Sequence, residues 1–308
     1  GRLKNEKVAL LHIPDPAPDF NGYEFVRWDV KAGDFLEEGL RIKAVYTPII
    51  TTDPVAYDTL VYNGTAQELV AAGVAKEGHI EYRLNEGDWS AELPEATNAA
   101  AYVVDYKLVR EGHDDYMAGS VTAVIAKAPV TYVAPQAYDT LAYNYNAQEL
   151  VSAGQTNDGT IEYSLDPTLL DSWSADLPQA MNAGTYDVYF RVQGDLNHFD
   201  SIAPAPVAVT IAKRDIVITA PVAYDTLVYN SLLQTLAAAG SADFGSMEYT
   251  MTPDNNEGWS ADMPQAVDAG TYAVYYRVQG DANHNDFAAS IAATVAKAQL
   301  TIMAEDKE

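Results

Sequence analysis

Two short polar strings have spacings that could hold a cation. Gly-Asp-x-Asn-His-x-Asp occurs at residues 194–200 and again at residues 280–286. Carboxylate and amide oxygens at alternate positions are ligands that Ca²⁺ accepts, although both strings lack the glycine and the distant glutamate of an EF-hand loop. A hairpin loop that uses Asp and Asn for turn geometry is the competing interpretation, and a transition metal at the histidine is a third. The predicted calcium ligands are Asp195, Asn197, Asp200, Asp281, Asn283 and Asp286.

A second group of residues could form a ligand-binding face. Three tryptophans stand in loop-like stretches before a proline, and two tyrosines stand two residues before an arginine, on the side of a strand that faces away from its core. Aromatic rings and arginines of this kind bind proteins or glycans, but the same tryptophans could close the edge of a core and the tyrosines could form cross-strand pairs. The candidate face consists of Tyr189, Arg191, Tyr275, Arg277, Trp89, Trp173 and Trp259.

Catalytic motifs are missing from the sequence. It contains no His-Glu-x-x-His, no phosphate-binding Gly-x-x-x-x-Gly-Lys and no Gly-x-Ser-x-Gly. The absence of cysteine excludes disulfides, thiolate metal sites and cysteine nucleophiles. We therefore predict that the chain is not an enzyme and uses no cofactor, apart from the calcium considered above.

The formal net charge of −26 limits the partners further. Nucleic acids and anionic membrane surfaces repel such a chain, and no apolar stretch is long enough to cross a bilayer. Because like-charged copies repel one another, we expect a monomer. The sequence thus predicts no nucleic-acid partner and no membrane insertion.

Three landmarks recur in the same order and divide the chain into repeats. They are Tyr-Asp-Thr-Leu at 57–60, 138–141 and 224–227, Trp-Ser-Ala at 89–91, 173–175 and 259–261, and Ala-Lys at 126–127, 212–213 and 296–297. They predict repeat 1 at residues 48–127, repeat 2 at 128–213 and repeat 3 at 214–298. A different segment precedes them at 1–47, and residues 299–308 are the start of a truncated further repeat or a tail.

Within each repeat the apolar residues alternate with a period of two. Tyr272, Val274, Tyr276 and Val278 alternate with more polar residues, and the other repeats follow the same pattern, which predicts strands with one face in a core. The strings that end in Tyr102, Tyr186 and Tyr272 resemble the tyrosine corner of immunoglobulin-like sandwiches. In repeat 1, Ala100 replaces the glycine of that string, so we expect strain there if the position requires a positive φ. A β-grasp-like repeat is the alternative, but no amphipathic helix is long enough to cross a sheet.

Residues 50–298 resemble the MBG-type tandem repeats of bacterial surface proteins. The strings that carry the resemblance are YNGTAQELV at 62–70, GTIEYSL at 159–165 and DAGTYAVYYRVQGDANHND at 268–286. Residues 22–28 and 44–46 resemble part of an internalin-type β-repeat spanning about residues 7–47, with Arg27 where that pattern has glycine. The resemblances imply an extracellular, bacterial, adhesin-like or stalk protein without catalytic residues.

The expected fold is therefore all-β. It consists of tandem immunoglobulin-like β-sandwich modules in an elongated array, preceded by a small, partial β-grasp-like segment. The expected function is that of a non-enzymatic structural spacer or stalk of a bacterial cell-surface or secreted protein. The alternative is an adhesin module whose partner is an extracellular host protein or a glycan.

Overall fold

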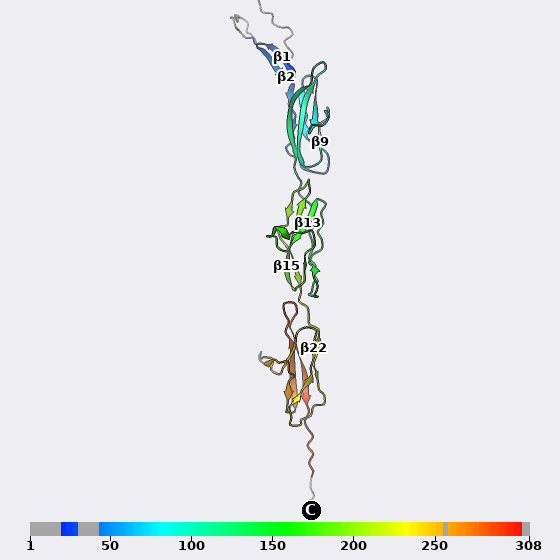
Figure 1. Ribbon diagram of the computed structural model, residues 1–308, viewed down its shortest axis with the longest axis vertical. Coiled ribbons are helices and arrows are strands. Elements are labelled where there is room, and N and C mark those ends of the chain that lie inside the picture. The colour runs from blue at the N-terminus through cyan, green and yellow to red at the C-terminus, as the bar shows by residue number, and fades with distance from the viewer. Residues whose placement is uncertain (1–19, 30–42, 255–257, 304–308) are drawn as a thin grey trace, which may run out of the picture. The chain divides into compact units, whose positions relative to one another are not determined.

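The computed structural model describes residues 20–29, 43–254 and 258–303 (Figure 1). Strands and turns dominate this part of the chain, which contains no α-helix. The chain divides into two compact units. Unit 1 takes in residues 1–132, 156–160 and 192–201, and unit 2 takes in residues 133–155, 161–191 and 202–308. One end of repeat 2, which carries the first Asp-x-Asn-His string, is thus grouped with repeat 1.

Unit 1 begins with a two-stranded antiparallel sheet. Strand β1 (Tyr23–Trp28) pairs with β2 (Ala44–Pro48), and the register shifts between Phe25 and Arg27. Of the span that resembles an internalin-type β-repeat, residues 7–19 and 30–42 lie outside the described residues. The β-grasp-like character of residues 1–47 therefore stays a prediction.

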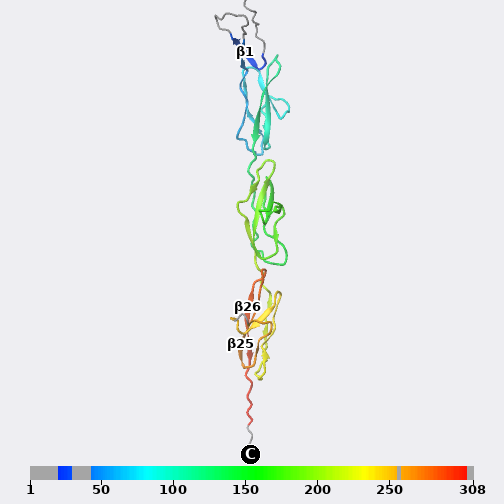
Figure 2. The same ribbon diagram turned by 60° about the vertical axis from the view of Figure 1, so that its left-hand side comes forward.

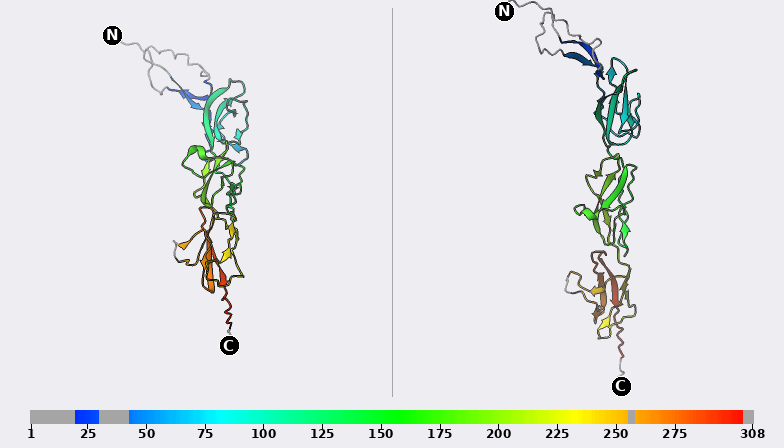
Figure 3. Two further views of the ribbon diagram at one scale, coloured as in Figure 1. Left: turned by 60° about the horizontal axis from the view of Figure 1, so that its bottom comes forward. Right: turned by 45° about the horizontal axis from the view of Figure 1, so that its top comes forward.

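Repeat 1 has one broad antiparallel sheet and several short strand pairs. The broad sheet has the order β11-β10-β8, with β8 at His79–Leu84, β10 at Ala100–Val109 and β11 at Tyr116–Ile125. β10 and β11 lie side by side as long ribbons in Figures 1 and 3. The short pairs are β3 (Ile50–Thr52) with β7 (Val74–Ala75), β4 (Val55–Ala56) with β6 (Val70–Ala71), and β5 (Gln67–Glu68) with β9 (Glu95–Ala96).

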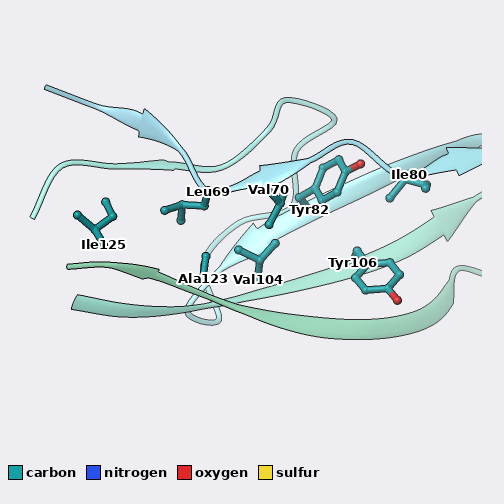
Figure 4. Packing of buried hydrophobic residues seen from close by; sticks show 8 residues of the cluster. All are labelled: Leu69, Val70, Ile80, Tyr82, Val104, Tyr106, Ala123 and Ile125. Atoms are coloured by element: carbon teal, nitrogen blue, oxygen red, sulfur yellow. The ribbon is translucent and has the colours of Figure 1, made fainter. Parts of the chain in front are cut away.

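The core of repeat 1 lies between these two layers. Val104 on β10 is completely buried, as are Leu69 and Val70 from the opposite layer. Figure 4 shows Val104 and Ala123 pointing toward Leu69 and Val70 across the interior. Burying an aliphatic side chain of this size stabilises a fold by about 1.5–3 kcal/mol. Since the alternate residues of β10 face this core, the period-two pattern of the sequence is confirmed.

The other strands build the same arrangement in repeats 2 and 3. In repeat 2 the sheet has the order β13-β15-β16, with β17 also paired to β15. In repeat 3 the order is β23-β25-β26, and Figure 2 labels β25 and β26. The repeat 2 elements are β12 (Gln148–Glu149), β13 (Gly159–Ser164), the 3₁₀ turn η1 (Leu170–Ser172), β14 (Gln179–Ala180), β15 (Gly184–Gly194), β16 (Ser201–Ile202) and β17 (Val207–Ile211). The repeat 3 strands are β18 (Ile218–Thr219), β19 (Val222–Ala223), β20 (Gln234–Thr235), β21 (Ala237–Ala238), β22 (Ser241–Ala242), β23 (Met247–Thr250), β24 (Gln265–Ala266), β25 (Gly270–Val278) and β26 (Phe287–Val295).

The tyrosine corner is present in every repeat. The hydroxyl of Tyr102 donates to the carbonyl oxygen of Asn98 at 2.8 Å, and Tyr186 donates to Asn182 at the same distance. Tyr272 donates to the carbonyl of Asp268 at 2.7 Å. Each bond fixes the backbone just before the long central strand. Together with the two-layered antiparallel sheets, it confirms the predicted all-β, immunoglobulin-like sandwich.

The apolar alternation does not continue past the ends of β13 and β23. Leu165 and Met251 follow Ser164 and Thr250, the last residues of these strands, and both side chains are exposed. The strain considered for Ala100 is absent, because that residue does not have a positive φ. Of the corresponding glycines, Gly184 has a φ of 156° and Gly270 has no positive φ.

Candidate functional site

The two Asp-x-Asn-His strings form tight loops, which we call the Asn–His loops (residues 194–200 and 280–286). In the first loop the Asp195 carboxylate accepts from the amide of Asn197 at 2.8 Å and from Nδ1 of His198 at 2.7 Å. The Asp200 carboxylate accepts from the amide of Gly194 at 2.9 Å and closes the loop. Such side-chain-to-backbone bonds are the reason Asp and Asn favour turns.

The second loop repeats this geometry. The Asp281 carboxylate accepts from the amide of Asn283 and from Nδ1 of His284, each at 2.8 Å. Asp286 accepts from the amide of Gly280 at 2.8 Å. Since an ionised carboxylate only accepts hydrogen bonds, Nδ1 of each histidine carries a hydrogen. The carboxylates thereby fix both the turn and the orientation of the imidazole.

The asparagine of each loop binds the preceding repeat. Asn197 accepts from the backbone amide of Ala99 through Oδ1 at 2.8 Å, and its Nδ2 donates to Oδ1 of Asn98 at 3.2 Å. We call Asn197 and Asn283 the latch asparagines, and the contacts they make joint 1 and joint 2. At joint 2, Asn283 makes the same bonds to Ala183 at 2.8 Å and to Asn182 at 3.2 Å.

The tyrosine corner places the partner of each latch asparagine. The carbonyl of Asn98 is held by the Tyr102 hydroxyl, and the latch bond goes to the next residue, Ala99. The same sequence of contacts links Tyr186, Asn182 and Ala183. A feature that stabilises one sandwich thus also presents an N–H group to the next one.

A lysine at the end of each repeat adds to its joint. Lys127 donates from Nζ to the carbonyl oxygens of Asp195 at 2.9 Å and His198 at 3.1 Å. Lys213 donates to the carbonyl oxygen of Asp281 at 2.7 Å. The residue after each lysine pairs with the Asn–His loop. Ala128 makes a parallel bridge with His198, and Arg214 makes one with His284. The linker is thus tied to the loop that contacts the preceding repeat.

The loop histidines are buried against aromatic rings. His198 is 9% exposed and meets Tyr62 edge-on, with ring centroids 5.2 Å apart. His284 is 2% exposed and meets Tyr143 at 5.3 Å in the same geometry. It also stacks on Phe244 at 3.8 Å. Edge-to-face ring pairs stabilise contacts beyond the area they bury.

Joint 2 contains an additional residue, Tyr145. Its hydroxyl lies 3.1 Å from Nε2 of His284 and accepts from Nη1 of Arg214 at 3.0 Å. Tyr145 has a φ of 68°, in the left-handed region that a bulky residue rarely occupies. The corresponding residues are Gly64, with φ of 80°, and Ser231, with φ of 64°. A strained residue at a contact is typical of a position held by its surroundings.

Acidic residues at the joints are held in the ionised form. The hydrogen bond from the His198 side chain lowers the pKa of the Asp195 carboxyl below its usual value, and His284 lowers the pKa of Asp281 in the same way. The pKa of Asp158 is lowered mainly by the hydroxyl of Thr131, and further by the Thr131 amide. Each carboxylate therefore stays an acceptor down to acidic pH.

Repeat 1 lacks the Asn–His loop because it meets a different neighbour. Its corresponding loop, residues 111–115, reads Glu-Gly-His-Asp-Asp. The carbonyl of Asp114 accepts from Nδ2 of Asn21 at 2.8 Å, and Nη2 of Arg110 donates to Oδ1 of Asn21 at 3.3 Å. This loop therefore contacts Asn21, just before β1, instead of a tyrosine corner. The sequence difference follows the change of partner.

The six predicted calcium ligands do not form a metal cluster. The aspartates bond to amides and imidazoles of their own loops, and the asparagines bond to the preceding repeat. Across residues 20–29, 43–254 and 258–303, no group of three or more His, Asp or Glu side chains is arranged to hold a metal ion. Calcium binding at these loops stays an untested prediction without structural support.

The predicted ligand face is divided into separate pairs of side chains. The Arg191 guanidinium lies 4.5 Å from the Trp173 ring centroid and pairs with Glu162 at 2.7 Å. Arg277 lies 4.3 Å from the Trp259 ring, and both Arg83 and Lys107 lie over Trp89. Tyr189 and Tyr275 are half-buried on the outer side of their strands. A cation over each indole leaves less of the ring to stack on a sugar.

The sequence offered no direct sign of the partners of the latch asparagines. Asn98 and Asn182 stand one residue before an alanine, in strings that were interpreted only as tyrosine corners. The sequence does contain one indication of these partners. Each repeat with an Asn–His loop follows a repeat that has Asn-Ala at its tyrosine corner. Repeat 1 lacks the loop, and residues 1–47 before it contain no Asn-Ala pair.

Comparisons with known proteins give limited information. No family model matches the chain, and no curated protein matches it. Among solved structures, it is similar to the chicken CNTN1 FN1–FN3 domains at 10% identity and a TM-score of 0.21, covering 80% of this chain and 100% of that one. Sidekick-1 immunoglobulin domains 1–5 match at 14% identity and a TM-score of 0.19, covering 80% of this chain and 58% of that one. TM-scores this low support no inference about function.

Within the described residues, no helix has the length and apolarity that a membrane span requires.

Proposed function

We propose that this chain is a non-enzymatic structural spacer of a bacterial cell-surface or secreted protein. One observation carries the proposal: the same asparagine latch occurs at both joints between repeats. An adhesive or catalytic role would not require neighbouring repeats to be bonded in the same way. A spacer does require it, because unlatched modules on a flexible linker do not hold a fixed distance.

Other features support the same role. The motifs resemble those of MBG-type surface repeats, for which an extracellular location is expected. Net charge of −26 favours a chain that stays apart from its own copies and from nucleic acids. The spacer proposal places the chain outside the cell as a monomer, and an adhesin that binds a host protein or glycan is the alternative.

The test measures how tightly neighbouring repeats are held. Thr122 and Ala208 are exposed at corresponding positions of β11 and β17, and the chain has no cysteine of its own. Thr122→Cys and Ala208→Cys therefore accept two spin labels uniquely. We expect electron–electron double resonance to give a narrow distance distribution. Adding Asn197→Ala should broaden it, because Ala99 and Asn98 both lose their partner.

Joint 2 provides the matched control. With labels at Ala208→Cys and Ala292→Cys, the distribution should broaden with Asn283→Ala and stay unchanged with Asn197→Ala. An unsubstituted chain that already gave distributions as broad as those of the latch variants would refute the spacer proposal. In that case, binding to glycan arrays and host matrix proteins would be the measurement for the adhesin alternative.

A further inference from the structure

Repeat 3 has the binding surface of a joint without an Asn–His loop on it. A hollow of about 430 Å³ is lined by Tyr229, Asp268, Ala269, Lys297, Ala298, Gln299 and Leu300. We call this hollow the socket. Four of these residues correspond to parts of joints 1 and 2. Asp268-Ala269 follows the pattern of Asn98-Ala99, Lys297 follows that of Lys127, and Tyr229 follows that of Tyr62.

The correspondence extends to the backbone around the socket. The amide of Tyr229 donates to the carbonyl of Ala296 at 2.9 Å, as Tyr62 donates to Ala126 and Tyr143 to Ala212 at the same distance. The Tyr272 hydroxyl holds the carbonyl of Asp268. The socket is therefore formed in the same way as the surfaces that receive Asn197 and Asn283.

The residues after Lys297 give a second, independent observation. Leu300 and Ile302 stand three and five residues after Lys297, as Ile216 and Ile218 stand after Lys213. Ile216 is 7% exposed and Ile218 is part of β18, paired with β22. By contrast, Leu300 is 86% exposed and Ile302 is 82% exposed. An apolar alternation without a paired strand is costly to expose.

We infer that the socket binds the Asn–His loop of a further repeat of this type, one whose first strand contains Leu300 and Ile302. The incoming asparagine would accept from the amide of Ala269 and donate to the carboxylate of Asp268. The Asp268 carboxylate would accept a hydrogen bond from the incoming Nδ2, as Oδ1 of Asn98 accepts from Asn197. The negative charge of the carboxylate strengthens such a bond. An imidazole would lie against Tyr229, and Lys297 would donate to carbonyls of the loop.

The chemistry of the socket excludes the first repeat of a second copy as its occupant. The loop of repeat 1 has Gly112-His113 and no asparagine at the latch position. The Asn–His loops of repeats 2 and 3 are already engaged in joints 1 and 2. The inference rests on the joint geometry and does not depend on the proposed spacer role.

The experiment adds a repeat to the chain. A copy of residues 219–298 is joined directly after Ile302, so that Leu300 and Ile302 take the places of Ile216 and Ile218 in the added repeat. Amide hydrogen exchange of Ala269 is then followed by NMR. We expect exchange to slow on the order of ten-fold relative to the unextended chain, since one hydrogen bond forms at a site that opens locally. Ala183, already latched at joint 2, should not change.

Two variants make the result decisive. Asn283→Ala made only in the added copy should return Ala269 to its faster exchange. If that added copy does not fold, a copy of residues 133–213, joined after Ile302 in the same register, replaces it, because it carries Asn197. Ala269 exchange that stayed fast with both extensions would overturn the inference. The inference would also be overturned if amide exchange of Ala269 slowed as the concentration of the unextended chain was raised. That result would mean that a second chain occupies the socket.

Discussion

At each joint, one asparagine side chain makes two hydrogen bonds to the preceding repeat. Asparagine supplies one acceptor and a donor on the same planar group, which matches the Ala99 amide and the Asn98 oxygen together. Alanine offers neither, and aspartate would lose the donor. The sequence singled out these asparagines, but it offered a cation as their partner and gave no direct indication of the preceding repeat. Oxygen atoms that could ligate a cation are also good turn and interface acceptors, and spacing alone does not distinguish the two.

The tyrosine corner gives a first prediction at the residue scale. Tyr186→Phe removes the bond to the carbonyl of Asn182 and should lower the free energy of unfolding by about 1 kcal/mol. Urea denaturation measures this. Tyr189→Phe is the control, because that side chain lies on the outer face of the same strand and is not part of the corner. Equal losses in the two variants would contradict a special role for the corner.

The lowered pKa values of Asp195 and Asp281 predict acid sensitivity. Unfolded aspartate titrates near about 3.9, and the folded pKa of both groups is lower. Their stabilising contribution is therefore fully present above the unfolded pKa and is lost as pH falls through the folded pKa.

Unfolding followed from neutral pH to about pH 2.5 tests this expectation. Stability should decline below about pH 4. The decline should be smaller in Asp281→Asn, because that variant has no charge to lose at joint 2. An identical acid profile for Asp281→Asn and the unsubstituted chain would refute the assignment.

At the scale of elements, the long strands were predictable and the short ones were not. β10 and β25 have enough residues for an apolar alternation to be recognised, and their inward residues are buried. β4 and β6 have two residues each, too few to show any period. The joints were unpredictable for another reason. Their bonds connect residues about a hundred positions apart, such as Asn98 and Asn197, and no local pattern encodes that pairing.

The turn that contains Tyr145 gives a prediction at this scale. Tyr145→Gly relieves the left-handed backbone, a gain of about 1 kcal/mol, but removes the contacts to His284 and Arg214. Ser231→Gly relieves a similar φ in repeat 3, where the serine hydroxyl donates to the hydroxyl of Tyr229 at 3.2 Å. We therefore expect a higher melting temperature for Ser231→Gly than for Tyr145→Gly. Equal shifts would show that Tyr145 adds nothing to joint 2.

At the scale of the whole molecule, stability should depend on neighbouring repeats. In tandem arrays each repeat contacts its neighbours, and total stability is approximately the sum of repeat and interface contributions. The grouping of residues 192–201 with repeat 1 in a single compact unit agrees with substantial contacts across joint 1. The repeat boundaries and the elongated arrangement stay predictions from the sequence.

A comparison of thermal unfolding in millimolar Ca²⁺ and in EDTA tests the remaining metal hypothesis. A ligand that binds only the folded state, at a concentration one hundred times its dissociation constant, raises the free energy of unfolding by about 2.7 kcal/mol. We expect no shift in melting temperature, because the loop carboxylates are already used by amides and imidazoles. A clear rise with Ca²⁺ would restore the six loop residues as candidate ligands.

The parallel bridges near the ends of each repeat have a mechanical consequence. Val61 pairs with Ala126, Ala142 with Ala212 and Val228 with Ala296, each in parallel. When a chain is pulled from both ends, parallel neighbours are drawn in opposite directions along their length. The hydrogen bonds between them are then loaded in shear and must break together rather than one after another. Each repeat would thus resist tension at the point where the chain leaves it, with no covalent cross-link.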